Sequence, residues 1–275
     1  MNPITETILQ DTLVKRTENS YKGTYGKVLI VGGNEDMGGA AILTASAAVY
    51  SGAGLVTVAT AKANHVSLHA RLPEAMVIDS ADTEKVADQV KNVDVIVIGP
   101  GLGLSNDALT ILTTVFSAVT SEQYLIIDGS AITLMVKRGV SYPQTHTVYT
   151  PHAGEWKKLS GLSKDEQNDK ENALYQQEIG GTIVLKSNRT KVYFEDSIWK
   201  NTVGNPAMAT GGMGDTLAGM IAGFVAQFED KEKAVLAAVF LHSKIGDLLA
   251  EKQYVTLPTH IIEQIPFMMK RYSQY

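Results

Sequence analysis

Short runs of apolar residues, each ending in glycine or a polar cluster, recur along the first two thirds of the chain. Such runs are typical of strands buried on both faces, as in a parallel sheet. The helical patterns between them indicate right-handed β-α-β crossovers. We therefore expect an α/β fold with a mostly parallel central sheet. The expected strands lie in Lys27–Gly33, Leu55–Thr60, Val93–Gly103, Tyr124–Ala131, Thr145–Glu155 and Thr182–Thr190.

The pattern changes after Lys186. Polar and apolar residues alternate around Glu195 and Asp196, which predicts a hairpin at the edge of the sheet. A helix of small residues is expected at Ala40–Gly54, between the first two strands. Two or three helices are expected to finish the chain, at Gly214–Phe228, Glu232–Lys252 and Pro258–Tyr272.

Composition limits the class of protein. The chain has 275 residues, of which 44% are hydrophobic and 19% charged, so it can form a sizeable core and we expect one domain over residues 1–275. The net charge of -5 does not favour nucleic acid or an anionic membrane as a partner. The absence of cysteine excludes disulfides and thiolate catalysis. Because no signal sequence or membrane span is visible, we expect a cytoplasmic protein.

Unusual residue clusters follow the expected strands. In an open parallel sheet, ligands bind at the carboxyl ends of the strands, where these clusters would meet. Their convergence predicts a site at that edge. The clusters are Gly32–Asn34, Gly99–Gly103, Asp128–Ser130, Thr150–Glu155 and Lys186–Thr190.

The segment GGMGD, Gly211 to Asp215, stands at the start of an expected helix. A helix start has unpaired N–H groups and partial positive charge, and glycines let an anion approach that backbone closely. Asp215 could simply complement the helix dipole, but that would not explain three glycines, which cost conformational entropy. We favour an anion hole at Gly211, Gly212, Met213 and Gly214, with Asp215 as a base beside a bound phosphate.

Two familiar nucleotide motifs are absent, and two other clusters stay ambiguous. Leu185 precedes Lys186 where a Walker A loop needs glycine, and Leu104 interrupts a dinucleotide fingerprint after GPGLG. Lys186 to Thr190 could bind a phosphate or form a solvated turn. His152 and Glu155 could act in a site or merely begin a helix.

Six segments in order carry a family resemblance. They resemble the ADP-dependent NAD(P)H-hydrate dehydratases, repair enzymes of the ribokinase-like superfamily that are related to the carboxy-terminal half of fused bacterial epimerase–dehydratase proteins. The resemblance covers Lys22 to Tyr272 and implies a three-layer sandwich with helices on both faces of the sheet. The segments are KGTYGKVLIVGG, GGAAILTASAAVYSGAGLV, VIGPGLG, TPHAGEWKKLSG, VLKSNRT and NPAMATGGMGDTLAGMIAGF.

The resemblance implies restoration of hydrated NADH or NADPH, with ADP as phosphoryl donor and Mg²⁺ as cofactor. Asp215 would deprotonate the hydrate hydroxyl. The family's contacts to the hydrated dinucleotide fall on Ala40, Gly103, His152 and Asp215. Its nucleotide contacts fall on Lys186, Ser187, Asn188, Arg189, Thr190 and Gly214, and Glu155 would help organise Mg²⁺ through water. The resemblance also implies that the protein assembles as a homotetramer.

The sequence departs from the family pattern in three motifs and leaves alternatives open. Met213 replaces a threonine of the glycine motif, which keeps the backbone N–H but removes a hydroxyl, and Ala153 replaces a proline. The family's DAGAL motif reads DGSAI at residues 128–132, which keeps the acid as Asp128. From the chain length we expect no epimerase domain. A kinase of a small vitamin-precursor alcohol and a nucleotide sensor without turnover are the alternatives. ADP against ATP, and hydrated NADH against hydrated NADPH, stay open.

Overall fold

The structure is a computed structural model that describes residues 1–163 and 165–273. Its strands form one ten-stranded sheet. In chain order they are β1 (Asn2–Ile4), β2 (Lys27–Val31), β3 (Leu55–Thr60), β4 (Met76–Asp79), β5 (Val95–Ile98), β6 (Tyr124–Ile127), β7 (His146–Tyr149), β8 (Thr182–Leu185), β9 (Lys191–Tyr193) and β10 (Ile198–Asn201).

The strand order across the sheet is β1-β10-β9-β8-β7-β6-β5-β2-β3-β4. The strands from β4 across to β8 are all parallel, which confirms the expected mostly parallel sheet. The antiparallel hairpin of β9 and β10 is also confirmed. It is not the outermost element, because β1 pairs in parallel with β10 and forms that edge. A three-residue strand containing Pro3 carries too little pattern to be predicted.

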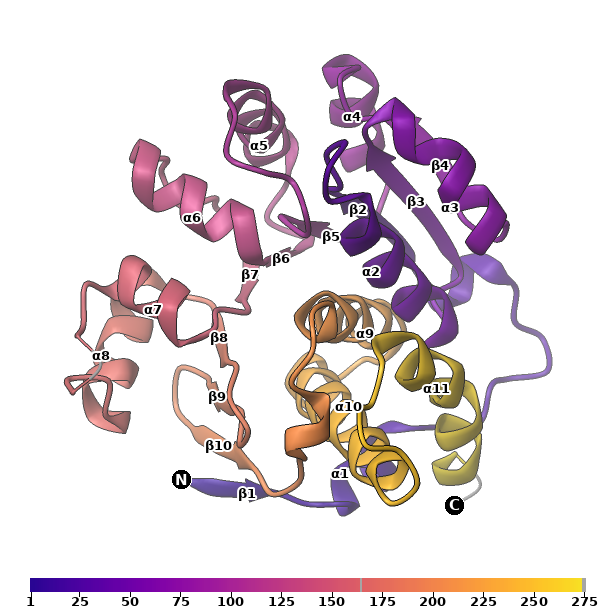
Figure 1. Ribbon diagram of the computed structural model, residues 1–275, viewed down its shortest axis with the longest axis vertical. Coiled ribbons are helices and arrows are strands. Elements are labelled where there is room, and N and C mark those ends of the chain that lie inside the picture. Colours follow the sequence, from indigo (N-terminus) through magenta and orange to yellow (C-terminus); the bar gives the residue numbers. More distant parts are fainter. Residues whose placement is uncertain (164, 274–275) are drawn as a thin grey trace.

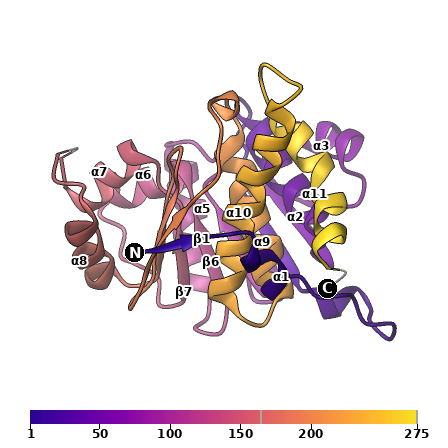
Figure 2. The same ribbon diagram turned by 90° about the horizontal axis from the view of Figure 1, so that it is seen from below.

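Helices cover both faces of the sheet (Figures 1 and 2). The described helices are α1 (Thr7–Thr12), α2 (Gly38–Tyr50), α3 (His65–Arg71), α4 (Thr83–Val90), α5 (Asn106–Ala118), α6 (Gly129–Arg138), α7 (Ala153–Ser160), α8 (Asp169–Ile179), α9 (Met213–Gln227), α10 (Lys231–Ala250) and α11 (Pro258–Tyr272), with short 3-10 turns η1 (Lys22–Tyr25), η2 (Lys62–Asn64) and η3 (Pro206–Met208).

Two separate hydrophobic cores lie between these layers. Val28 and Ile30 of β2 face a core shared with α1, α2, α3, α9, α10 and α11, whereas Leu29 and Val31 face a core shared with α4 to α8. This alternation follows from the two-residue period of a strand. The result is the expected three-layer sandwich. No described helix has both the length and the apolar character needed to cross a membrane.

The connections change face between β2 and β5. These neighbouring strands run in parallel, with Val28 beside Val95. The helix that follows β2 is α2, on one face, and the helix that follows β5 is α5, on the other. Such a topological switch point opens a crevice at the carboxyl ends of the strands, where α/β proteins bind ligands.

Close packing of α2 on α9 fixes the start of α9. A methyl group on Gly219 would lie 2.1 Å from the carbonyl oxygen of Thr44, and one on Gly223 would lie 2.7 Å from the Cβ atom of Ser51. Larger side chains would therefore push the two helices apart. The small residues that follow GGMGD serve this packing, which holds α9 against α2.

Candidate active site

Asp215 lies in the first turn of α9. The helix begins after Gly212, whose φ of 92° is in the left-handed region that favours glycine. The first-turn amides of a helix have no partner within that helix, so those of Met213 and Gly214 are available to an anion. Burial raises the pKa of Asp215 to about 6, reinforced by the charge of Asp128 and opposed by Lys186. A carboxyl group with this pKa is suited to act as a base near neutral pH.

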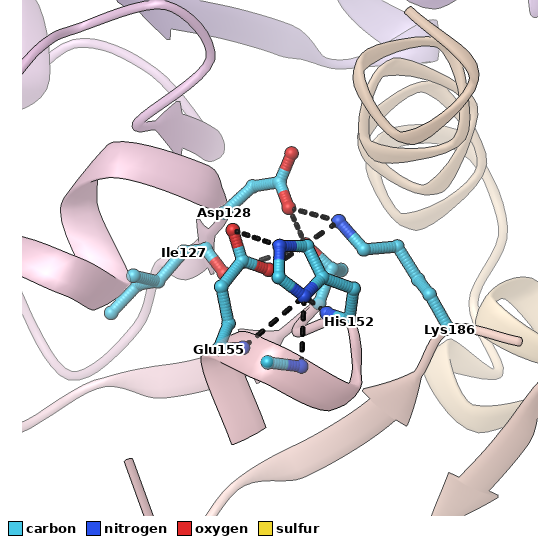
Figure 3. A network of polar contacts seen from close by, with 7 residues as sticks. Ile127, Asp128, His152, Glu155 and Lys186 are labelled. Carbon is cyan, nitrogen blue, oxygen red and sulfur yellow. Dashed lines mark hydrogen bonds and ion pairs between the residues drawn. The ribbon is translucent and has the colours of Figure 1, made fainter. Parts of the chain in front are cut away.

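Lys186 lies at the centre of a buried polar network (Figure 3). Its Nζ atom donates to Oδ1 of Asp128 at 2.6 Å, and the same oxygen accepts from the hydroxyl of Thr150 at 2.8 Å. Burial opposes the charge of Lys186, but Asp128 and Glu155 outweigh it and raise the pKa of the lysine. The ammonium therefore stays charged and fixed beside the start of α9.

His152 and Glu155 begin α7 with a reciprocal capping arrangement. Nδ1 of His152 accepts from the amides of Gly154 and Glu155, at 3.0 and 3.2 Å, so the neutral ring carries its proton on Nε2. Oε2 of Glu155 accepts from the His152 amide at 2.8 Å and lies 3.9 Å from Nζ of Lys186. The helix-start interpretation is thus confirmed, while the exposed His152 ring remains open to a ligand.

Lys186 to Thr190 form the turn between β8 and β9. Thr190 donates its hydroxyl to the carbonyl of Ser187 at 3.1 Å, which shapes the turn. Lys186, Ser187, Asn188 and Thr190 line a cavity of about 320 Å³ together with residues of η3, α9 and α10. Arg189 does not line it; its Nη1 atom donates to the carbonyl of Gly204, which does, at 2.7 Å. Gly214 also lines this cavity, which joins the predicted nucleotide segment to the anion hole.

Ala40 and Gly103 lie at the switch point. A methyl group on Gly101 would lie 3.0 Å from the Cβ atom of Ala40, which places the start of α2 against the loop after β5. The amide of Gly103 donates to the hydroxyl of Ser130, two residues beyond Asp128, at 3.1 Å. The predicted contacts to a hydrated dinucleotide therefore come from the segments that follow β7, β5 and β2, at the carboxyl edge of the sheet, and from the start of α9.

Two site residues were not assigned a role from the sequence. Asp128 follows an apolar run and is the acid of a motif shared with the family, which indicates its importance but not its contact with Lys186. His242, in the middle of α10, lines the cavity beside the Lys186–Thr190 turn, and the sequence around it has no feature that indicates this position. Burial lowers the pKa of His242 to about 4, so its ring is neutral at physiological pH.

The site offers little for a protein-only metal centre. No group of three or more His, Cys, Asp or Glu side chains in the described part of the chain is arranged to hold a metal ion. Glu155 is buried, and its oxygens face His152 and Lys186. This donor set suits a cation held by the phosphates of a bound nucleotide and by water, which is the usual mode for Mg²⁺.

A mostly parallel sheet between two helical layers, with the helix start Gly212-Met213-Gly214-Asp215 at its carboxyl edge, defines a ribokinase-like protein. A family model described as NAD(P)H-hydrate dehydratase matches residues 28–267. The chain belongs to this family.

Three relatives illustrate the similarity. The ADP-dependent (S)-NAD(P)H-hydrate dehydratase of Lactiplantibacillus plantarum is 52% identical, with 100% of this chain and 99% of that protein covered. The crystal structure of a ribokinase-like superfamily protein from Enterococcus faecalis matches with a TM-score of 0.98 and 47% identity, covering 100% of this chain and 97% of the other. The ADP/ATP-dependent NAD(P)H-hydrate dehydratase of Bacillus subtilis, co-crystallised with ATP and Mg²⁺, matches with a TM-score of 0.85 and 32% identity, covering 98% of each chain.

Proposed function

We propose that this protein uses ADP to dehydrate hydrated NADH and NADPH, which restores the reduced cofactor and releases AMP and phosphate. The observation that carries the proposal is the position of Asp215. Asp215, whose carboxyl pKa is raised to about 6, stands in the first turn of α9, among the helix-start amides and within range of the Lys186 charge. Membership of the dehydratase family and the names of its close relatives support the same activity.

Asp215 removes the proton from the hydroxyl group of the hydrated ring. The resulting oxygen nucleophile attacks the β-phosphorus of ADP, and the bond from that phosphorus to the bridging oxygen breaks to release AMP. The amides of Gly211 to Gly214 and the Lys186 ammonium stabilise the negative charge on the transferred phosphoryl group. Phosphate then leaves with the carbon–oxygen bonding electrons, the ring nitrogen supplies an electron pair, and loss of a ring proton restores the double bond.

This scheme explains why a nucleotide is needed for a dehydration. Hydroxide is a poor leaving group, whereas phosphate is a good one. The cavity beside Lys186 to Thr190 would bind the adenosine part of ADP, and Gly214 would bring its phosphates to Asp215. Mg²⁺, when bound with the nucleotide phosphates and linked to Glu155 through water, would neutralise their charge.

The proposal also covers the phosphoryl donor, the domain organisation, the location and the oligomeric state. We take ADP as the phosphoryl donor, by analogy with the bacterial relatives, although the Bacillus subtilis protein is described with both ADP and ATP. We also propose that residues 1–275 act as one domain, that the protein works in the cytoplasm, and that it assembles as a homotetramer. The continuous sheet from β1 to β4 supports the single domain.

The test is recovery of the near-ultraviolet absorbance of reduced nicotinamide from hydrated NADH, with Mg²⁺ and either ADP or ATP. Recovery with ADP is expected, and the Asp215→Asn variant should lower kcat by about 10²–10⁴-fold, the range for loss of a general base. Binding of ADP, measured by calorimetry, should persist in this variant because Asn keeps the size of the side chain.

Three other outcomes would change the assignment. Recovery with ATP alone would keep the reaction and overturn ADP as donor. Transfer of phosphate to a vitamin-precursor alcohol, with no recovery from either hydrate, would favour the kinase. Equal inactivity of wild type and Asp215→Asn, with nucleotide bound to both, would favour a sensor.

A further inference from the structure

A cavity of about 810 Å³ lies at the edge of the sheet opposite to the proposed active site. The helices α2 and α9 both start at the carboxyl ends of the strands, and their last residues, Tyr50 and Gln227, line this cavity. Tyr25 also lines it, two residues before β2 begins. The cavity is therefore separate from the site around Asp215, and we call it the amino-edge cavity.

The walls of the amino-edge cavity are largely apolar. Val49, Phe228 and Met269 come from α2, from the residue after α9, and from α11. Val14 lies opposite them in residues 13–21, which connect α1 to η1 and pass the C-terminal end of α11 (Figure 2), and it is 66% exposed. The volume is within the usual range of small-molecule sites, about 300–1,000 Å³. A ligand that covers these side chains would gain binding energy from the apolar area it buries.

The charged groups around the cavity are all positive. Lys15, Arg16 and Lys270 line it, and its described lining contains no Asp or Glu. All three side chains are exposed, so a ligand can reach them. Because the whole chain has a net charge of -5, this cluster is a local reversal of sign that favours an anionic group.

Arg16 is the cation that the structure holds in place. Its Nη2 atom donates to the carbonyl of Gly52 and, at 3.0 Å, to Oε1 of Gln227. Its guanidinium also lies 3.7 Å from the centre of the Tyr25 ring, a cation–π contact. These hydrogen bonds use Nη2 alone, so the N–H groups of Nη1 and Nε stay available for charge-assisted hydrogen bonds to an anion. A cation fixed in advance loses little side-chain freedom when it binds.

The chemistry of the ligand follows from these features. Apolar walls require an apolar body, and a rim with only positive charge requires an anion and disfavours an amine. One negative charge is enough, because the fixed cation is the single guanidinium of Arg16. The walls come from separate segments of the chain and surround a narrow volume, which suits one chain of methylene groups and not the surface of a bilayer.

We propose that the amino-edge cavity binds a free single-chain carboxylate, with its carboxylate on Arg16 and its chain against Val49, Phe228 and Met269. The proposal is independent of the reaction at Asp215, because it rests on a different edge of the sheet.

The test is calorimetric titration of hexanoate, octanoate and decanoate into the full chain at pH 8, each below its critical micelle concentration. The variants are Arg16→Met, Val14→Asp and Lys22→Met. Lys22 is an exposed cation close in sequence that does not line the cavity, so Lys22→Met is a matched loss of one positive charge. Val14→Asp places a carboxylate in the wall at an exposed position that the fold tolerates. Thermal unfolding confirms that each variant is folded, and sedimentation velocity gives its oligomeric state.

Binding should tighten by roughly tenfold for each pair of added methylene groups, because each methylene contributes about 0.8 kcal/mol when it is buried. Arg16→Met should raise the Kd of decanoate by about tenfold, the effect of losing a hydrogen bond to a charged group. Val14→Asp should raise it as well, and Lys22→Met should leave it unchanged. Decylammonium, which has the same chain and the opposite charge, should not bind.

Several results would overturn the site. These are no binding of decanoate to the wild type, a Kd that does not depend on chain length, or equal effects of Arg16→Met and Lys22→Met. Binding to vesicles of anionic lipid without binding of free decanoate would assign the surface to a membrane. Dissociation of the assembly by Val14→Asp, without binding of decanoate to the wild type, would assign it to a second copy of the chain.

Discussion

Lys186 and Asp128 come from strands that are not neighbours, yet Nζ of Lys186 donates to Oδ1 of Asp128 at 2.6 Å. Lys186 follows β8 and Asp128 follows β6, so the pair reaches across the end of β7. The ammonium also lies 3.9 Å from Glu155. Asp215 thus faces a lysine whose charge is already shared with two other acids, which helps to explain why the pKa of Asp215 stays near 6.

The first prediction concerns the pH dependence of kcat/KM. Because Asp215 must be ionised to act as a base, activity should fall as the pH falls through about 6. Asp128→Asn removes a repelling charge and frees Lys186 to approach Asp215, and both changes lower the pKa of Asp215. The acidic limb of the profile should therefore move to lower pH.

The prediction is tested by comparing the pH profiles of kcat/KM of the wild type and Asp128→Asn. A phosphate on the substrate has its own ionisation near pH 6, so the limb in the wild type alone does not identify Asp215. A lower kcat with an unshifted limb in Asp128→Asn would contradict the proposed coupling.

The second prediction is that Asp215→Asn stabilises the fold at pH 8. The carboxyl has a higher pKa in the folded state, about 6, than its ordinary value of 3.8, so ionising it destabilises the folded protein. This loss of folding free energy is fully present at a pH above the folded-state pKa of about 6 and absent at a pH below the ordinary pKa of 3.8. Urea denaturation should give a gain of up to about 3 kcal/mol at pH 8, from 1.36 kcal/mol per unit of pKa.

This gain should shrink as the pH is lowered from 8 to 5, because the wild-type carboxyl becomes protonated. Protein concentration is held fixed, since self-association changes apparent stability. A pH-independent difference between wild type and Asp215→Asn would show that packing, and not ionisation, sets the effect.

The third prediction tests the Lys186–Asp128 pair. Lys186→Met leaves a buried carboxylate without its partner and should lower the free energy of unfolding by about 3–5 kcal/mol. Asp128→Asn combined with Lys186→Met removes both charges and should recover most of that loss. Chemical denaturation of the wild type, both single variants and the double variant measures the coupling.

ADP binding, unlike stability, should not recover in the double variant. Neither Lys186→Met nor the double variant has an ammonium beside Gly214, so both should bind ADP weakly although one of them is stable. Recovery of ADP binding in the double variant would refute the assignment of Lys186 to the phosphates.

Much of the fold could be predicted because buried parallel strands are continuous apolar runs. β3 matches its expected bounds, Leu55–Thr60, and α11 matches Pro258–Tyr272. The strand β4, Met76–Asp79, was not predicted, since it is short and one end is exposed.

The site could be predicted only where its signal is local. The helix start at Gly211 to Asp215 is visible in the sequence because glycines and one carboxylate adjoin. The Asp128–Lys186 contact depends on the strand order, which local pattern does not determine. Arg189 shows the opposite case: its charge suggested a nucleotide contact, whereas its guanidinium donates to the Gly204 carbonyl, and the contact stays a prediction.

The last prediction compares Gly214 with Gly212, the two glycines on either side of Met213 at the start of α9. A methyl group on Gly214 would lie 3.1 Å from Nζ of Lys186, at the far end of a flexible side chain, and its φ is not in the left-handed region. Gly214→Ala should keep or slightly raise stability, because alanine favours a helix by about 1 kcal/mol over glycine. It should weaken ADP binding by displacing the ammonium and narrowing the approach to the backbone.

Gly212→Ala should have the opposite effect on stability. Gly212 has a φ of 92°, and its added methyl group would lie 2.5 Å from Cδ1 of Leu43, so the variant should lose about 1–3 kcal/mol of stability. Thermal unfolding and ADP titration of both variants check the pair. If Gly214→Ala binds ADP as tightly as the wild type does, the phosphates do not approach the start of α9 as closely as the anion hole requires. That result would contradict the role of Asp215 as a base beside the phosphates.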